Sequence, residues 1–392
     1  MKPLRIAHLA DTQLGYRALF KSDPVSGRNQ RAVDFERAYQ TAVDDILTRG
    51  VDLVVHAGDV FHHTRPSWAA IRAFVRQTRR LSEAGLPLLV IGGNHDTPRL
   101  RTSGSVFSVL ELALPGTRFV TGYEQEGVEF PGLDLLVTAI PHGKLVDPLG
   151  PSAIPAPGVR NVLVTHGMVA GLKLKGRPHE PGEEDVADFL LGEDFDYIAL
   201  GHYHVFDRVR SNAWYSGSTE RTGWGDEDVD PGYALVEIGE PGAGAAATHI
   251  PVGGRPMRTL AAVDGDGLAA AEIAEMVLAE IGREVPADGM ARVELRNTPR
   301  VVRREAETLL RRAAADLVWS LQVFSPADIL AGFGERSGDG VVTDIGGLFE
   351  EFLGQRDFDP AFADAFRLRG RQALEDAART LEHADATEDS AA

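Results

Sequence analysis

Short apolar runs alternate with segments of helical periodicity over the first half of the chain. The apolar runs at residues 5–10, 51–57, 86–91, 133–140, 161–164 and 197–200 are typical of buried strands. Residues 34–49 place apolar side chains on one helical face and end at Gly50, and a second helix is predicted from Pro66 and Ser67 to about residue 84. Strands that alternate with helices predict an α/β fold built from βαβ units.

The spacing changes after residue 212, where apolar runs follow one another closely. Runs at 213–216, 233–238 and 248–252 predict a second, partly antiparallel sheet packed on the first, and the glycine- and alanine-rich residues 240–247 predict a loop. Two prolines and two glycines within residues 251–256 predict a domain boundary, which gives a first domain of residues 1–254. Residues 255–326 follow a β-α-β-α-β pattern and predict a small α+β domain.

The C-terminal part of the chain has a different character. The glycine-rich residues 327–341 predict a linker, and residues 342–380 predict two short amphipathic helices. A helix pair of this kind does not bury its apolar face alone, so it either folds back on the protein or docks on another chain. Residues 381–392 have almost no large apolar side chains and are predicted to be disordered.

Composition and charge restrict the chemistry and the partners. The 392 residues include no cysteine, which excludes disulfides, thiolate metal sites and cysteine nucleophiles. The formal net charge of −18 argues against a broad nucleic-acid-binding face, and the acidic residues at 182–196, 226–230 and after 375 are interpreted mainly as solvated surface. The first residues lack a signal-peptide pattern and no apolar run could span a bilayer, so a cytoplasmic location is expected.

Metal-binding residue types follow five of the predicted strands. Residues 91–97 read Ile-Gly-Gly-Asn-His-Asp-Thr, so an amide, an imidazole and a carboxylate come together directly after a strand. Open α/β sheets build their sites at the carboxyl ends of strands, and these loops are therefore expected to meet. The candidate ligands are Asp11, Asp59, Asn94, His166, His202 and His204.

This donor set favours hard or intermediate divalent cations. Oxygen and nitrogen donors without sulfur suit Mn²⁺, Fe²⁺, Zn²⁺ or Mg²⁺. Two such ions about 3.5–4 Å apart can hold a phosphate and stabilise both oxygens of an in-line displacement. Only a carboxylate bridges two ions readily, and Asp59 is the candidate. A single histidine at a strand end is more often an ordinary hydrogen-bonded residue, so the prediction depends on the co-occurrence of the five loops.

The motifs in these loops resemble those of the calcineurin-like metallophosphoesterases. The match is closer to the SbcD-type DNA-repair nuclease subunits at residues 58–66 (Gly-Asp-Val-Phe-His-His-Thr-Arg-Pro), 199–204 (Ala-Leu-Gly-His-Tyr-His) and 215–221 (Tyr-Ser-Gly-Ser-Thr-Glu-Arg). The motifs cover about residues 5–238, and beyond them only the layout is similar. The resemblance implies a sandwich of two sheets flanked by helices, a small α+β capping domain and a helical C-terminal tail.

The resemblance also implies two divalent ions, of which Mn²⁺ is the first expectation. One ion would be held by Asp11, Gln13, Asp59 and His204, and the other by Asp59, Asn94, His166 and His202. His95 would be the general acid, which agrees with its place beside the ligands. His62 would orient the scissile phosphate, although an unliganded surface histidine is nearly as good an interpretation. Asp96 would either orient His95 or shape the loop.

Gln13 departs from the family pattern, which has histidine at this position. A glutamine oxygen binds hard cations but is a poorer donor than imidazole for zinc or manganese. We therefore expect weaker occupancy of the first metal site and a lowered or narrowed nuclease activity.

Several residues outside the ligand loops are candidates for DNA or partner contacts. Tyr16, Arg17, Arg65 and Arg221 could contact the DNA backbone, and turn or salt-bridge roles are the alternative for the last two. By resemblance, helices near 67–81 and 105–112 would pair across a homodimer axis, whereas packing against the sheet is the competing interpretation. Residues 342–380 would bind a coiled-coil, SMC-like ATPase of the SbcC type.

The function implied by the resemblance is a metal-dependent 3′→5′ DNA exonuclease with single-strand endonuclease activity. It would act on DNA ends at the nucleoid, together with the ATPase, in double-strand-break repair. Two alternatives stay open: a phosphodiesterase for a small substrate such as a cyclic nucleotide, and a weakly active scaffold that tethers DNA ends because of Gln13.

Overall fold

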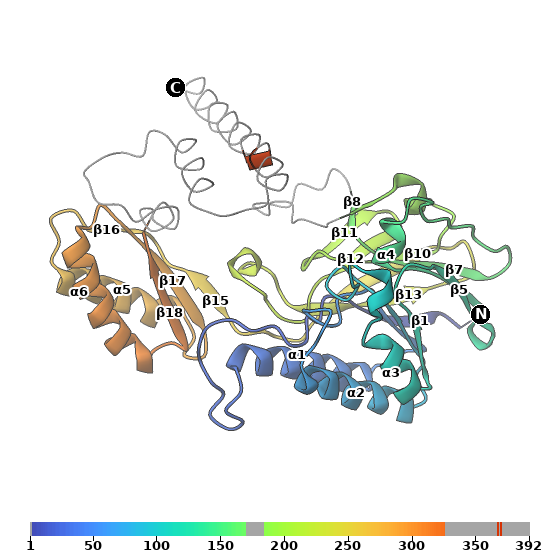
Figure 1. Ribbon diagram of the computed structural model, residues 1–392, viewed down its shortest axis with the longest axis horizontal. Helices are drawn as coiled ribbons and strands as arrows, with labels where there is room; N and C mark the ends of the chain where they lie inside the picture. The colour runs from blue at the N-terminus through green and yellow to red at the C-terminus, as the bar shows by residue number, and fades with distance from the viewer. Residues whose placement is uncertain (1, 170–183, 326–366, 368, 371–392) are drawn as a thin grey trace, which may run out of the picture. The chain divides into compact units, whose positions relative to one another are not determined.

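The computed structural model describes residues 2–169, 184–325, 367 and 369–370 (Figure 1). The described residues up to 325 belong to one compact unit. The predicted linker at 327–341 and the predicted tail at 381–392 lie outside the described residues, and so does nearly all of the predicted helical region at 342–380.

The first sheet has six strands in the order β14-β13-β1-β2-β3-β4. Its parallel strands are β1 (Leu4–Leu9), β2 (Leu53–His56), β3 (Leu88–Ile91) and β4 (Thr117–Val120). The antiparallel strands are β13 (Gly232–Ile238), which pairs with β1, and β14 (Ala245–Pro251), which pairs with β13.

The second sheet also has six strands, in the order β11-β12-β10-β7-β6-β5. Its parallel strands are β6 (Leu135–Ile140), β7 (Arg160–His166), β10 (Tyr197–Gly201) and β12 (Ala213–Ser216). The antiparallel edge strands are β5 (Glu126–Phe130) and β11 (Phe206–Arg210).

One prediction about the sheets is wrong. The runs near 213, 233 and 248 were expected to form the second sheet together, but only β12 lies in it. β13 instead pairs with β1, where Leu4 lies opposite Ile238, and it carries β14 into the first sheet. The predicted loop at 240–247 ends early because Ala245 and Ala247 belong to β14 and pack against the apolar layer between the sheets.

Apolar layers cover both faces of the first sheet. Alternate side chains such as Ile6 and Val55 point between the two sheets, where they meet Val137 and Val164 of the second sheet. Strands buried on both faces read as continuous apolar runs, which is why the sequence pattern locates them. The two packed sheets with flanking helices confirm the predicted α/β sandwich.

Three helices cover the other face of the first sheet and lie side by side in Figure 1. They are α1 (Gln30–Ile46), α2 (Trp68–Glu83) and α3 (Phe107–Ala113). α1 begins four residues before the predicted start, because Asn29 caps its first turn and polar residues of that turn are buried in an ion-pair network. On the outer face of the second sheet lie α4 (His142–Leu145) and the short strands β8 (Met168–Val169) and β9 (Asp185–Val186).

Residues after 256 form a third sheet with its own apolar core. In chain order the elements are β15 (Met257–Thr259), β16 (Val263–Asp264), α5 (Ala270–Glu284), β17 (Met290–Arg296), α6 (Arg300–Ala313) and β18 (Ser320–Phe324). β17 is central and pairs in parallel with the other three strands, and both helices pack on this sheet through residues such as Ile273, Val277 and Leu310. We call residues 255–325 the α+β region, and the domain boundary at 254–255 stays a prediction.

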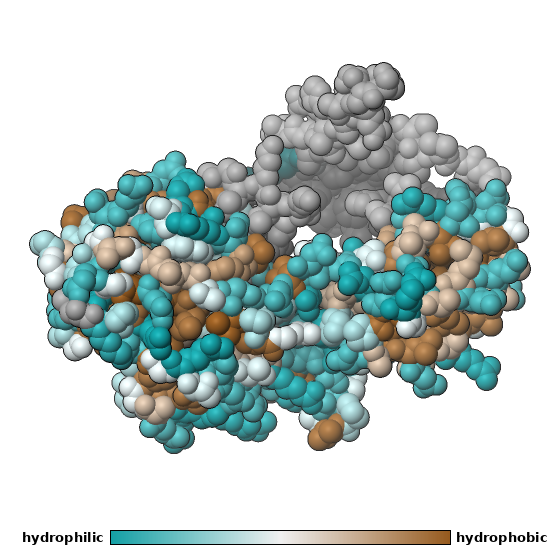
Figure 2. Space-filling model, turned by 180° about the vertical axis from the view of Figure 1, so that it is seen from behind, coloured by the Kyte–Doolittle hydropathy of each residue, from teal (hydrophilic) through white to brown (hydrophobic). Residues whose placement is uncertain are grey.

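The surface is mixed in character. Figure 2 shows hydrophobic residues in patches on a face that also carries many hydrophilic ones. Within the described part of the chain, no helix has both the length and the apolar composition needed to cross a membrane.

Candidate metal centre

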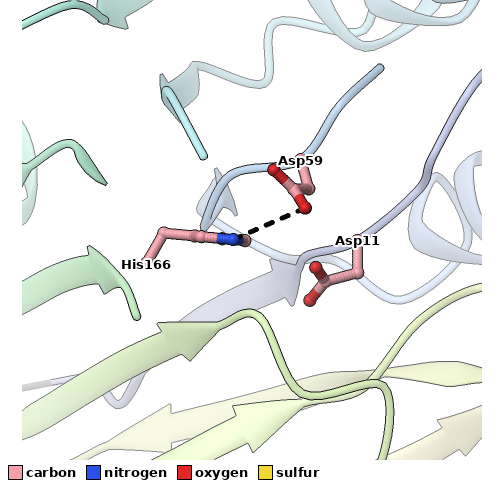
Figure 3. Close-up of side chains that lie close together, drawn as sticks. All are labelled: Asp11, Asp59 and His166. Atoms are coloured by element: carbon pink, nitrogen blue, oxygen red, sulfur yellow. Dashed lines mark ion pairs between the residues drawn. The ribbon is translucent and has the colours of Figure 1, made fainter. Parts of the chain in front are cut away.

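The predicted ligand loops meet where the carboxyl ends of strands from both sheets converge. Asp11 and Asp59 follow β1 and β2 of the first sheet, and His166 ends β7 of the second. Figure 3 shows these three side chains pointing toward one another. Their candidate ligand atoms all lie within 4.8 Å of one another, and all three residues are buried. The fold therefore places two carboxylates and one imidazole around a single point.

A second group of predicted ligands adjoins this cluster. The Asn94 Oδ1 atom lies 2.9 Å from His166 Nε2 and 3.3 Å from His202 Nδ1. The backbone N–H of His202 donates to Asp11 Oδ2 at 2.9 Å. Loops from four strands are thus linked directly through predicted ligands, by side-chain contacts and by the backbone N–H of His202.

Backbone strain is concentrated at these residues. Of the seven non-glycine residues with positive φ in the described part of the chain, four are predicted ligands: Asp11 (51°), Gln13 (45°), Asp59 (55°) and His202 (113°). Each such conformation costs roughly 1–3 kcal/mol and persists only where the surrounding structure enforces it. Strain of this kind is typical of functional sites.

Two glycines beside the ligands are required by close contacts. A Cβ atom on Gly93 would lie 2.2 Å from Asp59 Oδ1, and one on Gly58 would lie 2.5 Å from His166 Nδ1. Any larger residue at either position would push the side chain of a predicted ligand out of place. The glycines before Asp59 and Asn94 therefore serve the close approach of the loops as well as the turns.

The electrostatics of the cluster fit a bound cation. Burial alone would raise the pKa of Asp59, but the charge and hydrogen bond of His166, with the charge of His95, hold it well below its usual range. Burial would lower the pKa of His166, but Asp59 and Asp11 raise it to about 9. Burial raises the pKa of Asp11, and its Oδ1 atom has no hydrogen-bond partner among the described residues. A desolvated carboxylate oxygen left without a donor is what a metal ion would satisfy.

Neighbouring groups fix the orientation of two of the predicted histidine ligands. His166 Nδ1 lies 2.8 Å from the Ala57 carbonyl oxygen, so Nε2 faces Asp59 and Asn94. His204 Nδ1 lies 2.8 Å from Asp226 Oδ2. Histidine ligands of metals commonly donate their second ring N–H to a carbonyl or carboxylate in this way. Asp226 was not identified from the sequence, which placed it in a solvated acidic stretch, whereas the structure buries it.

Gln13 has an arrangement that the sequence did not predict. Its buried side chain donates from Nε2 to Asp59 Oδ2 at 2.8 Å, and its Oε1 atom lies 2.8 Å from His62 Nδ1. The amide nitrogen, not the oxygen, therefore faces the carboxylate that is predicted to bridge two ions. Asp11, Asp59 and His166 fit a metal centre as they stand, but Gln13 would have to turn over to offer its oxygen.

His95 and His62 line a cavity of about 200 Å³ beside the cluster, together with Asp59, His202, His204 and Tyr16. The His95 Nε2 atom lies 3.8 Å from Asp59 Oδ2, and its Nδ1 atom lies 3.1 Å from the His62 carbonyl oxygen. The two rings stack with centroids 5.0 Å apart. Burial, with the charges of His95 and His63, lowers the pKa of His62 to about 4, so this imidazole is neutral near pH 7.

Asp96 shapes the loop, which was one of its two predicted roles. Its carboxylate accepts from the backbone N–H groups of Val60 and Phe61, both at 2.9 Å. It thereby ties the loop that carries Asn94 to the loop that carries Asp59. Burial, followed by the charge of Asp59, raises the pKa of Asp96 to about 7.

The four predicted DNA contacts occupy different surroundings. Tyr16 lines the cavity, with its ring edge-on to His62 at a centroid distance of 4.9 Å. Arg17 and Arg65 are exposed. Arg221 is partly buried and donates from Nη1 to the Arg255 carbonyl oxygen at 3.1 Å. Contact with DNA stays a prediction for all four.

Comparison with known proteins defines the class of this protein. The family model of the calcineurin-like phosphoesterases matches residues 4–206, just over half of the chain. The chain therefore belongs to the calcineurin-like phosphoesterases, which are hydrolases of phosphoester bonds. The family resemblance inferred from the sequence motifs is confirmed, and membership in this family implies a site for two metal ions.

Within this family the chain is similar to proteins described as DNA double-strand break repair protein Mre11. It is 35% identical to that of Haloferax volcanii over 239 residues, which cover 60% of this chain and 49% of the relative. It is 31% identical to that of Thermoplasma acidophilum, over 54% of this chain and 55% of the relative. The chain thus spans about half the length of these relatives. A match to that of Halobacterium salinarum is 27% identical and covers 91% of this chain and 79% of the relative.

Solved structures with a similar backbone include TT1561 of Thermus thermophilus, at 13% identity and a TM-score of 0.38. This match covers 64% of the present chain and all of that chain. The purple acid phosphatase PPD1 from yellow lupin matches at 11% identity with a TM-score of 0.38, over 64% of this chain and 52% of the phosphatase.

Proposed function

We propose that this protein is a metal-dependent nuclease that acts on DNA ends in double-strand-break repair. The observation that carries the proposal is the buried cluster of Asp11, Asp59 and His166 next to a cavity lined by His95 and His62. Family membership supports phosphoester hydrolysis, and the similarity to Mre11 proteins supports DNA as the substrate.

The predicted ligands suit two divalent ions, for which Mn²⁺ is the first candidate and Mg²⁺, Fe²⁺ and Zn²⁺ are alternatives. Asp11, Asp59 and His204, with Gln13 if its amide turns, would hold one ion. Asp59, Asn94, His166 and His202 would hold the other. Bound ions would supply Lewis-acid stabilisation of the phosphodiester and a nucleophile at neutral pH.

The protein's own side chains would position the phosphate and transfer a proton. The Nδ1 atom of His95 lies next to the His62 carbonyl oxygen, which leaves Nε2 to give a proton to the leaving oxygen. The Nδ1 atom of His62 is held by Gln13, so its Nε2 atom is the one that would contact a phosphate oxygen. Tyr16 packs against His62 and would limit the tilt of that ring.

Finer features of the proposal follow the family resemblance. They are 3′→5′ exonuclease polarity, single-strand endonuclease activity, a location with the nucleoid in the cytoplasm, and an SMC-like ATPase partner of the SbcC type that binds residues 342–380. A homodimer is supported by exposed apolar side chains on α2 and α3: Trp68, Val109 and Leu112 are 86%, 64% and 85% exposed. Large exposed apolar residues on neighbouring helices are typical of an interaction surface.

A second candidate function is a weakly active scaffold that tethers DNA ends. It is favoured by the hydrogen bond between Gln13 and Asp59, which opposes binding of the first ion.

One assay separates the candidates. The full chain is incubated with Mn²⁺ and either end-labelled duplex DNA or a chromogenic phosphodiester, with Asp59→Asn as the control for metal-dependent activity. Digestion of DNA supports the nuclease. Hydrolysis of the small ester alone supports a small-substrate phosphodiesterase. DNA binding without hydrolysis of either substrate supports the scaffold.

A further inference from the structure

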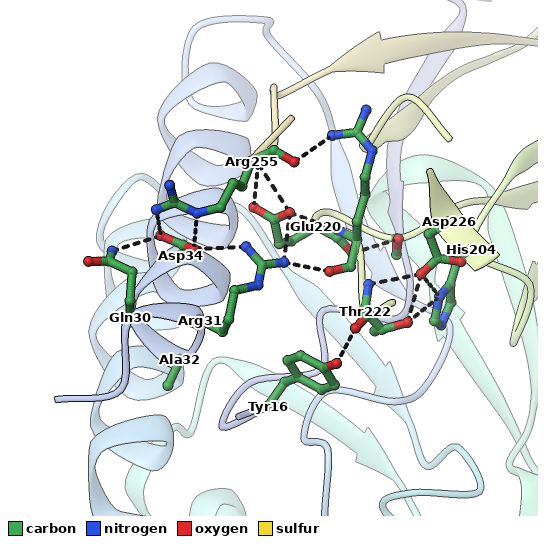
Figure 4. Close-up of polar contacts among 12 residues, drawn as sticks. Tyr16, Gln30, Arg31, Ala32, Asp34, His204, Glu220, Thr222, Asp226 and Arg255 are labelled. Carbon is green, nitrogen blue, oxygen red and sulfur yellow. Dashed lines mark hydrogen bonds and ion pairs between the residues drawn. The ribbon is translucent and has the colours of Figure 1, made fainter. Parts of the chain in front are cut away.

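A single 3₁₀ turn next to the metal centre holds one of the predicted ligands. This turn, η4 (Trp224–Asp226), lies between β12 and β13. The Oδ2 atom of Asp226 lies 2.8 Å from His204 Nδ1 and accepts from Thr222 through both its hydroxyl (2.7 Å) and its backbone N–H (2.8 Å), as Figure 4 shows. Asp226 is therefore fixed by its own loop while it contacts the imidazole.

The contact between Asp226 and His204 determines how the imidazole faces the cavity. With Nδ1 bonded to the carboxylate, a metal ion would be bound through Nε2, and rotation of the ring would break the Asp226 contact. The same loop also contacts Tyr16, another residue that lines the cavity, because the Thr222 carbonyl oxygen accepts from the Tyr16 hydroxyl. Thr222 and Gly223 also line the cavity.

The other side of this loop is attached to the α+β region. The indole N–H of Trp224 donates to Gln322 Oε1 of β18 at 2.7 Å. The guanidinium of Arg292, from β17, lies over the Trp224 ring at 4.7 Å. Glu227, directly after the turn, accepts from the backbone N–H and the hydroxyl of Thr259. Three strands of the α+β region therefore hold the residues on both sides of Asp226.

A buried ionic network attaches the start of the same loop (Figure 4). The Glu220 carboxylate accepts from Arg31 of α1 at 3.2 Å and from the backbone N–H of Arg255. The Arg255 side chain binds Asp34 of α1 through two nitrogens, at 2.7 and 2.8 Å. The segment 220–227 is thus clamped between α1 and the first residues of the α+β region.

We propose that Asp226 is a positioning residue for the metal ligand His204, and that the α+β region sets its position through segment 220–227. The inference rests on the proposed function only in taking His204 as a metal ligand. It gives the α+β region, which lies outside the ligand loops, an influence on metal binding that acts through segment 220–227.

The first test measures Mn²⁺ binding to the full chain by isothermal titration calorimetry. Asp226→Ala removes the acceptor, so the affinity of one Mn²⁺ site should fall about 10- to 100-fold. Asp226→Asn keeps an oxygen that accepts from Nδ1–H but lacks the charge, and its loss should be smaller. The matched control is Asp228→Asn, a carboxylate two residues away that is exposed, and its affinity should equal that of the native protein.

A spectroscopic measurement on the metal-free protein covers the case in which Asp226→Ala fails to fold. The ¹⁵N shifts of His204 should report a protonated Nδ1 in the native protein and in Asp226→Asn. A native His204 that is protonated on Nε2 alone, or native Mn²⁺ affinity in a folded Asp226→Ala variant, would overturn the inference. Weaker Mn²⁺ binding in the variants supports it whether or not the native protein digests DNA, so the proposed function and this inference can fail separately.

The second test addresses the α+β region. Trp224→Phe keeps a ring beneath Arg292 but loses the hydrogen bond to Gln322, and Gln322→Leu loses the same bond from the other side. Each change should weaken Mn²⁺ binding about 2- to 10-fold, and the double variant should be no weaker than either single one. Additive effects would mean that the two residues act separately, and unchanged affinity in both would overturn the coupling.

Discussion

Replacement of Gln13 by histidine should strengthen metal binding, and the structure indicates by how much. The Gln13 amide nitrogen donates to Asp59 Oδ2 at 2.8 Å, so its oxygen faces His62 instead of the carboxylate. To bind an ion shared with Asp59, the amide must turn over and give up this hydrogen bond. A histidine at position 13 would supply a nitrogen donor without that step.

The expected magnitude follows from the bond that is lost. A hydrogen bond to a charged group contributes about 1.5–3 kcal/mol. At about 1.4 kcal/mol for each tenfold change in an equilibrium constant, this corresponds to a dissociation constant about 10- to 100-fold higher for the native site. Gln13→His should therefore tighten the weaker Mn²⁺ site by about that factor.

Calorimetric titration with Mn²⁺ of the native protein, Gln13→His and Gln13→Leu provides the assay. Gln13→Leu also removes the bond to Asp59 but offers no ligand atom, so it should bind Mn²⁺ no more tightly than the native protein. Equal affinity in the native protein and Gln13→His would refute the reasoning. So would equal tightening in both variants, because release of Asp59 alone would then explain the gain.

Three further predictions concern stability and catalysis. Arg31→Met leaves the buried Glu220 carboxylate without its partner cation and leaves Asp34 paired with Arg255 alone, and urea unfolding should show a loss of about 3–5 kcal/mol. Burial raises the pKa of Asp34, but hydrogen bonds from Arg255 and Gln30 and the charges of Arg255 and Arg31 lower it below the usual value. The stability from this pKa shift is fully present above the ordinary carboxyl pKa of about 4 and is lost as the pH falls below it. Between about pH 5 and pH 3, Asp34→Asn should therefore lose less of its free energy of unfolding than the native protein does. A parallel loss in both proteins would contradict this prediction. His95→Ala should lower the rate of DNA digestion at least about 100-fold without changing Mn²⁺ affinity, and a matching loss of Mn²⁺ binding would show that His95 acts as a ligand.

The strands and the ligand loops could be predicted because each leaves a pattern in a short stretch of sequence. A strand buried on both faces is an apolar run, and the residue at its end, such as Asp59 or His166, stands out by its polarity. Parallel strands deliver such residues to one edge, so the meeting of the loops also follows from sequence. The pairing of β13 with β1 could not be predicted in the same way, because it joins residues more than 200 positions apart and leaves no local pattern.

Two features of the site could be recognised only from the tertiary structure. Asp226 lies in an acidic stretch that is typical of solvated surface, and only its burial next to His204 shows another role. Gln13 departs visibly from the family motif, but the sequence does not tell which end of its amide faces Asp59. Both depend on contacts between residues distant in the chain, which local periodicity and motif spacing do not record.

The central claim, that distant loops meet to hold a pair of cations around one shared aspartate, is tested most directly by the stoichiometry of Mn²⁺ binding. The native chain should bind two Mn²⁺ ions at saturation. Asp59→Asn should weaken both together, since a single amide oxygen cannot bridge two ions as a carboxylate does. Native protein that binds no Mn²⁺, or an Asp59→Asn variant that binds two ions with unchanged affinity, would contradict the account.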